Sequence, residues 1–281
     1  MSIPSAPLGG RSLSLKTAVL RTFLALAIVL NAAGQTTECA KVTRSGDEVT
    51  MVADSIRVVD SLANTLAQTF GVVVSAEEPQ YEFSGDLQDV READPDWSAK
   101  HPKAHYFVPK RRHIEIRFSV LPDGSPSDVG FLLQQVLDKV KDQLPFSYRL
   151  DVDGDFASFV PTTTRNADGV VVSATPLLDR RVTIPLGSRR ISENGMLMAD
   201  SLSSQTGLRV DCCQSIVAGI PWGVPVVPFE AHDETARKVL ERLILLNQQS
   251  NWVSSRNYWL LRCDSDWCSI NVENVLGGGC R

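Results

Sequence analysis

The sequence predicts an α+β fold of two related halves, each with about two helices packed on a small mixed β-sheet. A helix–glycine–strand pattern occurs twice. Each copy is followed by a strand, a second helix and a hairpin, in a spacing typical of mixed α and β layers. The predicted halves are residues 38–165 and 170–281, and the polar, turn-rich stretch 162–169 links them.

The repeated pattern is centred on Gly71 and Gly207. Before Gly71, apolar residues recur every four positions and form one helix face: Val58, Leu62, Leu66 and Phe70. Superposing the two glycines matches Leu66 with Leu202, Ala63 with Ala199 and Val74 with Val210. Glycine suits the left-handed position that ends a helix, and an apolar strand follows each glycine directly. We therefore expect a helix, a glycine cap and a strand in both halves.

The second unit of the first half begins at residues 113–120, where apolar and polar residues alternate as in a half-buried strand. Residues 125–128 resemble a capping box with Pro126 at the first helical position, and apolar residues then follow at helical spacing up to Val140. Residues 146–152 and 156–160 predict a hairpin that turns at 153–155.

The second half repeats this order. Residues 224–229 predict a strand, which Pro225 and Pro228 place at a sheet edge. Asp233 is the predicted cap of a helix that contains Leu240. A hairpin of residues 251–254 and 258–263 follows, with a further strand over 268–272.

The first 34 residues predict a signal peptide. Three cationic residues precede the apolar run 23–30, and small residues at 32–34 suit a signal peptidase. The run is shorter than the roughly 20 residues that span a bilayer. We therefore expect a periplasmic or secreted protein of 281 − 34 = 247 residues, with no membrane insertion after cleavage.

The charge of the predicted mature chain disfavours nucleic acid and anionic lipid as partners. Residues 1–34 contain three of the 28 Lys and Arg residues and none of the 33 Asp and Glu residues, which leaves 25 − 33 = −8. Nucleic acid and anionic membranes attract basic surfaces instead. No nucleic-acid partner is expected.

All six cysteines follow the predicted cleavage site, and an even number in an exported chain indicates disulfides. Cys263 and Cys268 flank a four-residue hairpin loop, within the reach of a disulfide. Cys39 and Cys280 lie near opposite ends of the mature chain, where a bond would tie the termini together. Cys212 and Cys213 are adjacent, so we expect them to bond elsewhere and not to each other, in a structural role and not as a redox pair.

The order strand–helix–strand, then strand–helix–hairpin, with Gln205-Thr206-Gly207 closing a helix before Leu208-Arg209-Val210, resembles the short N-terminal domain shared by secretins and TonB-dependent transducers. The likeness is greatest over residues 182–263. The whole chain is similar to uncharacterised exported bacterial proteins with two such halves. We expect no outer-membrane barrel or secretin ring after this region, and therefore a free-standing module. The resemblance implies docking onto a protein partner in the bacterial envelope.

The inserted segment 77–112 is rich in Pro, Asp and Lys, and segments of this length are usually functional or mobile. His101 and His105 have a spacing that could hold a metal on a helix, but Pro102 disfavours that helix. The acidic residues in this segment could serve acid–base chemistry, although a solvated charge run explains them more simply: Glu77, Glu78, Glu92, Asp94 and Asp96.

Two further motifs invite a functional interpretation. Residues 151–155 superficially resemble a calcium loop, but Gly154 is misplaced for an EF-hand and a hairpin turn is the better interpretation. Four tryptophans of the second half could form a binding platform, although aromatic residues on strands more often belong to the core: Trp222, Trp252, Trp259 and Trp267.

These observations favour a non-enzymatic, exported α+β module that binds an envelope protein, with no cofactor and no metal. Two alternatives stay open. One is a cell-wall or peptide hydrolase with its site in residues 77–112. The other is a glycan or small-ligand binder that uses the tryptophans, which requires at least two of their rings to be exposed on one face.

Overall fold

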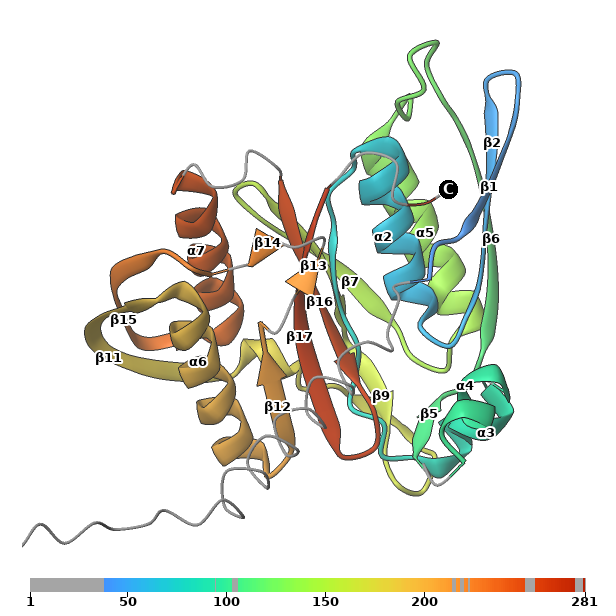
Figure 1. Cartoon of the computed structure of the whole chain (residues 1–281). Helices are drawn as coiled ribbons and strands as arrows, with labels where there is room; N and C mark the ends of the chain where they lie inside the picture. Colours follow the sequence, from blue (N-terminus) through green and yellow to red (C-terminus); the bar gives the residue numbers. More distant parts are fainter. Residues whose placement is uncertain are drawn as a thin grey trace, which may run out of the picture. The chain divides into compact units, whose positions relative to one another are not determined.

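A six-stranded sheet forms the centre of the computed structural model (Figure 1). The structure describes residues 38–93, 95–102, 106–213, 216–217, 220–221, 223–250, 256–275 and 280. The predicted signal peptide 1–34 and the predicted strand 251–254 lie outside the described residues. The strands of the sheet are, in spatial order, β12 (Arg209–Cys212), β17 (Trp267–Asn274), β16 (Asn257–Cys263), β3 (Ser75–Glu77), β8 (Phe156–Pro161) and β7 (Tyr148–Asp153). The predicted α+β class is confirmed.

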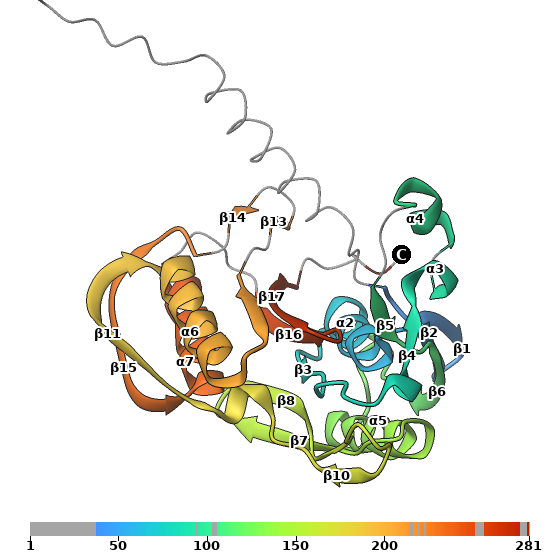
Figure 2. The same cartoon turned by 90° about the horizontal axis from the view of Figure 1, so that it is seen from below.

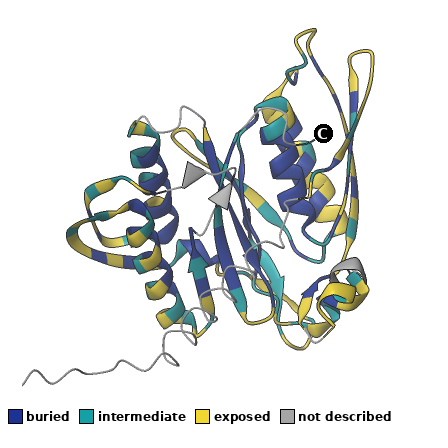
Figure 3. Ribbon diagram, in the orientation of Figure 1, coloured by how far each residue is buried: buried dark blue, intermediate teal, exposed yellow. Residues whose placement is uncertain are grey.

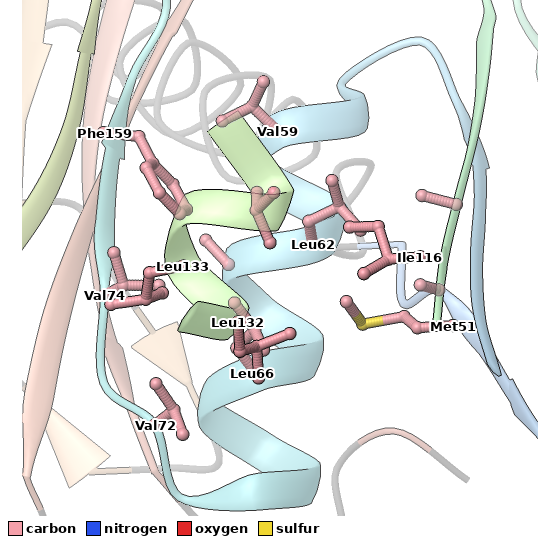
Figure 4. Packing of buried hydrophobic residues seen from close by; sticks show 14 of the residues in the cluster. Met51, Val59, Leu62, Leu66, Val72, Val74, Ile116, Leu132, Leu133 and Phe159 are labelled. Carbon is pink, nitrogen blue, oxygen red and sulfur yellow. The ribbon is translucent and has the colours of Figure 1, made fainter. Parts of the chain in front are cut away.

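Two helices and a second sheet cover one face of this central sheet. The helices are α2 (Val58–Phe70) and α5 (Val129–Gln143), and the second sheet consists of β1 (Lys41–Ser45), β2 (Glu48–Ser55) and β6 (Arg112–Ser119). Their apolar side chains form one buried cluster between the sheets, which Figure 4 shows from close by. Leu62, Leu66 and Leu132 are fully buried in it because the apolar positions of both helices recur at helical spacing.

The other face is covered in the same way by elements from later in the chain. These are α6 (Ile191–Thr206), α7 (Ala236–Gln249) and the two-stranded sheet of β11 (Arg181–Arg190) and β15 (Val226–Thr235). Figure 2 shows α6 and α7 on one side of β16 and β17, and α2 and α5 on the other. Every residue of β16 is buried, because Tyr258 and Leu260 pack against the first cluster while Trp259 and Leu261 pack against the second (Figure 3).

Apart from short inserted elements, residues 48–161 and 181–274 have the same order of strands and helices and the same pairing pattern. In each segment the first two long strands pair antiparallel, β2 with β6 and β11 with β15. The strand after the first helix pairs parallel with the last strand of the hairpin, β3 with β8 and β12 with β17. The hairpins are β7–β8 and β16–β17. A parallel pair, β16 with β3, joins the two three-stranded sets into one sheet, so the central sheet takes strands from both predicted halves.

The glycine caps are confirmed, since Gly71 and Gly207 end α2 and α6 with φ angles of 65° and 73°. Other helix starts differ from the prediction. Asp128 caps α5 by accepting a hydrogen bond from the Phe131 N–H, so Pro126 lies before the helix and not in its first turn. Thr235, not Asp233, caps α7, because β15 continues to Thr235.

The inserted segment is not one long loop. After the end of β3 it forms η1 (Ser84–Asp86), β4 (Leu87–Asp89), α3 (Val90–Ala93), α4 (Pro95–Lys100) and β5 (Phe107–Pro109). The remaining short elements are β9 (Thr163–Arg165), β10 (Val171–Ser173), η2 (Leu177–Asp179), β13 (Ile216–Val217) and β14 (Ile220–Pro221). The predicted linker 162–169 therefore includes the strand β9, which forms a hairpin with β10.

Candidate functional site

The acidic pair Glu77–Glu78 is buried, which corrects the prediction of a solvated charge run. The exposed fractions of the two residues are 0% and 4%. Both lie at the end of β3, in the middle of the central sheet, where β16 and β8 flank the strand. A buried carboxylate is costly unless a cation or hydrogen-bond donors compensate it, so the partners of these two residues define the most distinctive polar site of the described structure.

Arg57 compensates Glu78. Its side chain comes from the residue before α2 and is ion-paired with both Glu78 and Asp264, and it donates a hydrogen bond to the Cys263 carbonyl at 3.3 Å. The Cys263 N–H donates to the Glu78 carboxylate at 2.9 Å. Arg57 thus connects the start of α2 with the β16–β17 turn. These contacts join residues of the first predicted half to residues of the second.

A second ion pair lies nearby. Arg262 of β16 binds Asp60 of α2 at 2.6 Å between its Nε and the carboxylate oxygen Oδ2. Asp60 is 1% exposed and Arg262 is 5% exposed. This pair also crosses between the two predicted halves, so the contact between α2 and β16 contains buried charges as well as apolar side chains.

Arg237 compensates Glu77 on the other face of the sheet. Arg237 Nη2, from α7, lies 2.8 Å from Glu77 and 2.8 Å from Asp179 of η2. The Leu178 N–H donates to Glu77 at 3.1 Å, and the guanidinium lies 5.4 Å from the centre of the Trp259 ring, a cation–π arrangement. Glu77 is therefore held by a strand, a helix and a 3₁₀ turn at once.

Burial sets the protonation of these carboxyls. Desolvation raises the pKa of Glu78 to about 8 despite the opposing effect of Arg57, and the nearby Asp60 carboxylate adds to the rise. Burial also raises the pKa values of Asp60, Glu77 and Asp264, while their arginine partners lower them. We refer to the three arginines and their five carboxylate partners as the buried charge cluster: Arg57, Arg237, Arg262, Asp60, Glu77, Glu78, Asp179 and Asp264.

A small pocket adjoins Glu78. It is lined by residues of the inserted segment, of α2 and of the β7 region, among them Tyr81, Asp86, Lys110 and Tyr148. Its empty space is about 330 Å³, part of it open to solvent, and it has room for about one ordered water molecule. Burial raises the pKa values of Tyr81 and Tyr148, so both hydroxyls stay protonated at neutral pH. A typical small-molecule pocket encloses roughly 300–1,000 Å³, whereas the enclosed part of this one holds only about one water molecule.

The other candidates of the inserted segment do not gather around this pocket. His101 and Glu92 are exposed, whereas Asp94, His105 and the side chain of Asp96 lie outside the described residues. Among the residues that the structure describes, no three His, Cys, Asp or Glu side chains are grouped so as to hold a metal ion. Residues 151–153 end β7, and Gly154 and Asp155 form the β7–β8 turn, where Gly154 has a φ angle of 57°, as expected for a hairpin.

The six cysteines form three disulfides. Cys39 is bonded to Cys280 and Cys263 to Cys268, as the sequence suggests. The expectation for Cys212 and Cys213 is wrong, because their sulfurs are bonded to each other. Both residues are buried beside Gly195 of α6, and the other four cysteines are already bonded in pairs.

The tryptophans do not form the exposed platform that a glycan binder requires, as far as the structure describes them. Trp259 is fully buried, and Trp267 is partly buried with its indole N–H donated to Asp211 at 2.9 Å. The side chains of Trp222 and Trp252 lie outside the described residues.

Sequence reasoning missed the cationic half of the buried charge cluster. Arg57, Arg237 and Arg262 are far apart in the sequence and have no common spacing. One signal was available, because Arg262 stands inside the apolar run 258–263, where a charged residue must find a buried partner. No family model, no curated protein and no solved structure matches the chain.

Proposed function

We propose that the chain is an exported, non-enzymatic module, built from two copies of one sandwich unit, that docks onto a protein partner in the bacterial envelope. The observation that carries the proposal is the shared element order and strand pairing of residues 48–161 and 181–274. This order is the strand–helix–strand, strand–helix–hairpin order for which the chain resembles the short N-terminal domain of secretins and TonB-dependent transducers. That resemblance implies docking onto an envelope protein.

The chemistry of the buried charge cluster supports a structural role for the most distinctive polar residues. Each carboxylate of this cluster is ion-paired with an arginine, and the ion pairs Arg57–Asp264, Asp60–Arg262 and Glu77–Arg237 connect the two units. A catalytic carboxylate needs access to substrate, whereas these groups lie between packed elements. The ion pairs of the cluster therefore hold the two units in one fixed arrangement, which we call the lock. In this arrangement the two units together present a single rigid surface to a partner.

Export is supported by the disulfides, which persist in oxidising compartments. In the described part of the chain, none of the helices has the length and apolarity needed to cross a membrane.

Affinity capture from the periplasm of the source organism tests this proposal. The mature chain serves as bait, and its Arg57→Met variant, in which the lock is broken, serves as the matched control. We expect one envelope protein to be enriched reproducibly by the wild-type bait and not by the variant, and to bind the bait again when both are purified. Failure to enrich any such protein would contradict the proposal.

A hydrolase remains the second candidate, since Glu78 has a raised pKa and adjoins a pocket of the inserted segment. The small size of the pocket argues against it. Hydrolysis of peptidoglycan or peptide by the purified chain, lost on Tyr81→Phe substitution with unchanged melting, would favour the hydrolase over the docking module.

A further inference from the structure

The strand β10 has an open edge on the surface. It forms a two-stranded hairpin with β9 in which Val171 faces Arg165, Val172 faces Thr164 and Ser173 faces Thr163. The contacts that anchor the hairpin come from β9: Thr163 accepts a hydrogen bond from the Ser147 N–H, Thr164 donates one to the Gln80 carbonyl, and Arg165 is ion-paired with Asp86. β10 is the outer strand, and Figure 2 shows it at the rim of the structure.

Two of the three β10 side chains are valines, and they and the preceding Val170 are exposed. Val170, Val171 and Val172 are 58%, 54% and 37% exposed, and Ser173 is exposed as well. Successive side chains of a strand point to opposite faces, so both faces of β10 are open. A two-stranded hairpin with exposed apolar residues on both faces has little stability of its own in water. A strand added to its edge would cover these valines.

The other edge strands are protected against strand addition. β1 carries Lys41 and Arg44, β7 carries Asp151 and Asp153, and β11 and β15 contain prolines. In β12 the Val210 N–H points away from β17 and donates to Ser203 Oγ at 2.9 Å, so a side chain of α6 occupies it. Among the strands whose side chains the structure describes, β10 alone has neither a charged residue nor a proline.

The hydrogen-bond register of β10 is self-complementary. The Val170 carbonyl accepts from Asn166 and the Ala174 N–H donates to Thr162, so residues 170, 172 and 174 direct their backbone groups toward β9. By alternation, Val171 and Ser173 direct theirs outward. When two copies of β10 run antiparallel about a two-fold axis at Val172, Val171 of one copy faces Ser173 of the other, and both pairs have the hydrogen-bonded geometry.

We propose that β10 is a homodimerisation edge, at which two copies of the chain pair antiparallel to form a continuous four-stranded sheet, β9-β10-β10-β9. Closed two-fold dimers are the commonest assemblies of identical chains. The neutral edge allows two acidic chains to approach without placing like charges opposite each other. The interface is small compared with the roughly 800 Å² per partner of a stable complex, so we expect a dissociation constant of about 10 μM to 1 mM.

Analytical ultracentrifugation from about 1 μM to 1 mM tests the dimer. Val171→Pro removes an outward N–H and leaves the β9 pairing intact, so we expect its dissociation constant to rise at least about tenfold. Leu186→Ser, which removes an apolar side chain that is 69% exposed from β11, is the matched control and should dimerise like the wild type. A wild-type protein that stays monomeric to 1 mM, or a dimer that Val171→Pro does not weaken, would overturn the proposal.

A cysteine placed on the axis locates the contact. Val172 of the two copies would form a non-hydrogen-bonded pair with Cα atoms about 4.5 Å apart, within disulfide range. We expect Val172→Cys to give a covalent dimer on mild oxidation, and Val170→Cys, away from the axis, to give much less. Equal yields from both variants would contradict the register. A photo-crosslinker at position 171 that labels a different protein and never a second copy would show that a foreign strand is the occupant instead.

Discussion

Glu77 and Glu78 are adjacent in the chain but are ion-paired on opposite faces of the central sheet. Glu77 meets Arg237 of α7, and Glu78 meets Arg57 at the start of α2. The alternation of side chains along a strand makes this possible, since neighbouring residues point to opposite faces. One dipeptide at the end of β3 thereby connects the helical layers on both sides of the sheet, where the strands of residues 48–161 and 181–274 meet.

Removing an arginine of the buried charge cluster should lower the free energy of unfolding more than removing a surface ion pair. Arg57→Met leaves Glu78 and Asp264 buried without their cation, so we expect the free energy of unfolding to fall by about 3–5 kcal/mol. The control is Arg117→Met, whose pair with Glu115 is exposed on β6 and should contribute much less to the free energy of unfolding. Urea unfolding of both variants measures the difference. Equal losses would mean that the cluster does not stabilise the junction.

Stability should depend on pH through Glu241 of α7. Burial raises the pKa of Glu241 to about 7; Arg237 opposes the rise, and Asp153 and Asp151 add to it. The native state therefore binds more protons than the unfolded state, so the stabilisation is complete below about pH 4.5 and is lost as the pH rises through 7. We expect the free energy of unfolding of Glu241→Gln at pH 8 to exceed that of the wild type by on the order of 2 kcal/mol. At pH 5 the difference between the two proteins should be smaller. Unfolding curves with the same gap at both pH values would refute this assignment.

The matched leucines of the two helix–glycine units should contribute similarly to the free energy of unfolding. Leu66 and Leu202 are both fully buried, so replacing either with alanine should lower the free energy of unfolding by about 2–5 kcal/mol. Thermal or urea unfolding checks this directly. A negligible change at either position would show that the corresponding helix face is not packed as described.

Alanine substitutions at Gly207 and Gly130 distinguish a glycine needed for its backbone conformation from one that is not. Gly207 has a φ angle of 73° and no atom within 4 Å of an added Cβ, so Gly207→Ala should destabilise by about 1–2 kcal/mol through its backbone alone. Gly130, inside α5, has only ordinary contact with Asp128, and Gly130→Ala should stabilise by up to about 1 kcal/mol. Melting temperatures that shift in the same direction for both variants would contradict the left-handed cap.

Removing the terminal disulfide should weaken the fold. We expect the Cys39→Ser, Cys280→Ser double variant to lose about 2–5 kcal/mol, because the bond closes a loop with a sequence separation of 241 residues. The equivalent change at Cys263 and Cys268, which are separated by 5 positions, should cost less in the loop-entropy description. The reverse order in urea unfolding would assign the terminal bond to a dispensable role.

The elements that sequence analysis found are those with strong local periodicity. Leu62 and Leu66 repeat at helical spacing, and Ile114 and Ile116 alternate, so α2 and β6 follow from pattern alone. Short strands such as β3 and β4 have three residues each, too few for a period, and they depend on the neighbours that pair with them. The same holds for the parallel pair β16–β3, which joins segments far apart in the chain.

The polar site could not be predicted because its members share no spacing. Glu77 and Glu78 stand out as a pair in the sequence, but a charged dipeptide in a stretch rich in Asp and Pro resembles a solvated surface. Their burial follows from β3 lying between β8 and β16, which is a tertiary feature. Arg57 and Arg237 meet them only after that sheet has formed.

The bond between Cys39 and Cys280 turns the intervening polypeptide into a covalent ring. A protease that cuts one surface loop would leave both pieces attached, and the nicked product would run as separate fragments only after reduction. A single cut between those two cysteines cannot release a fragment. In the presence of proteases the two pieces would therefore stay covalently joined even when the backbone is no longer continuous.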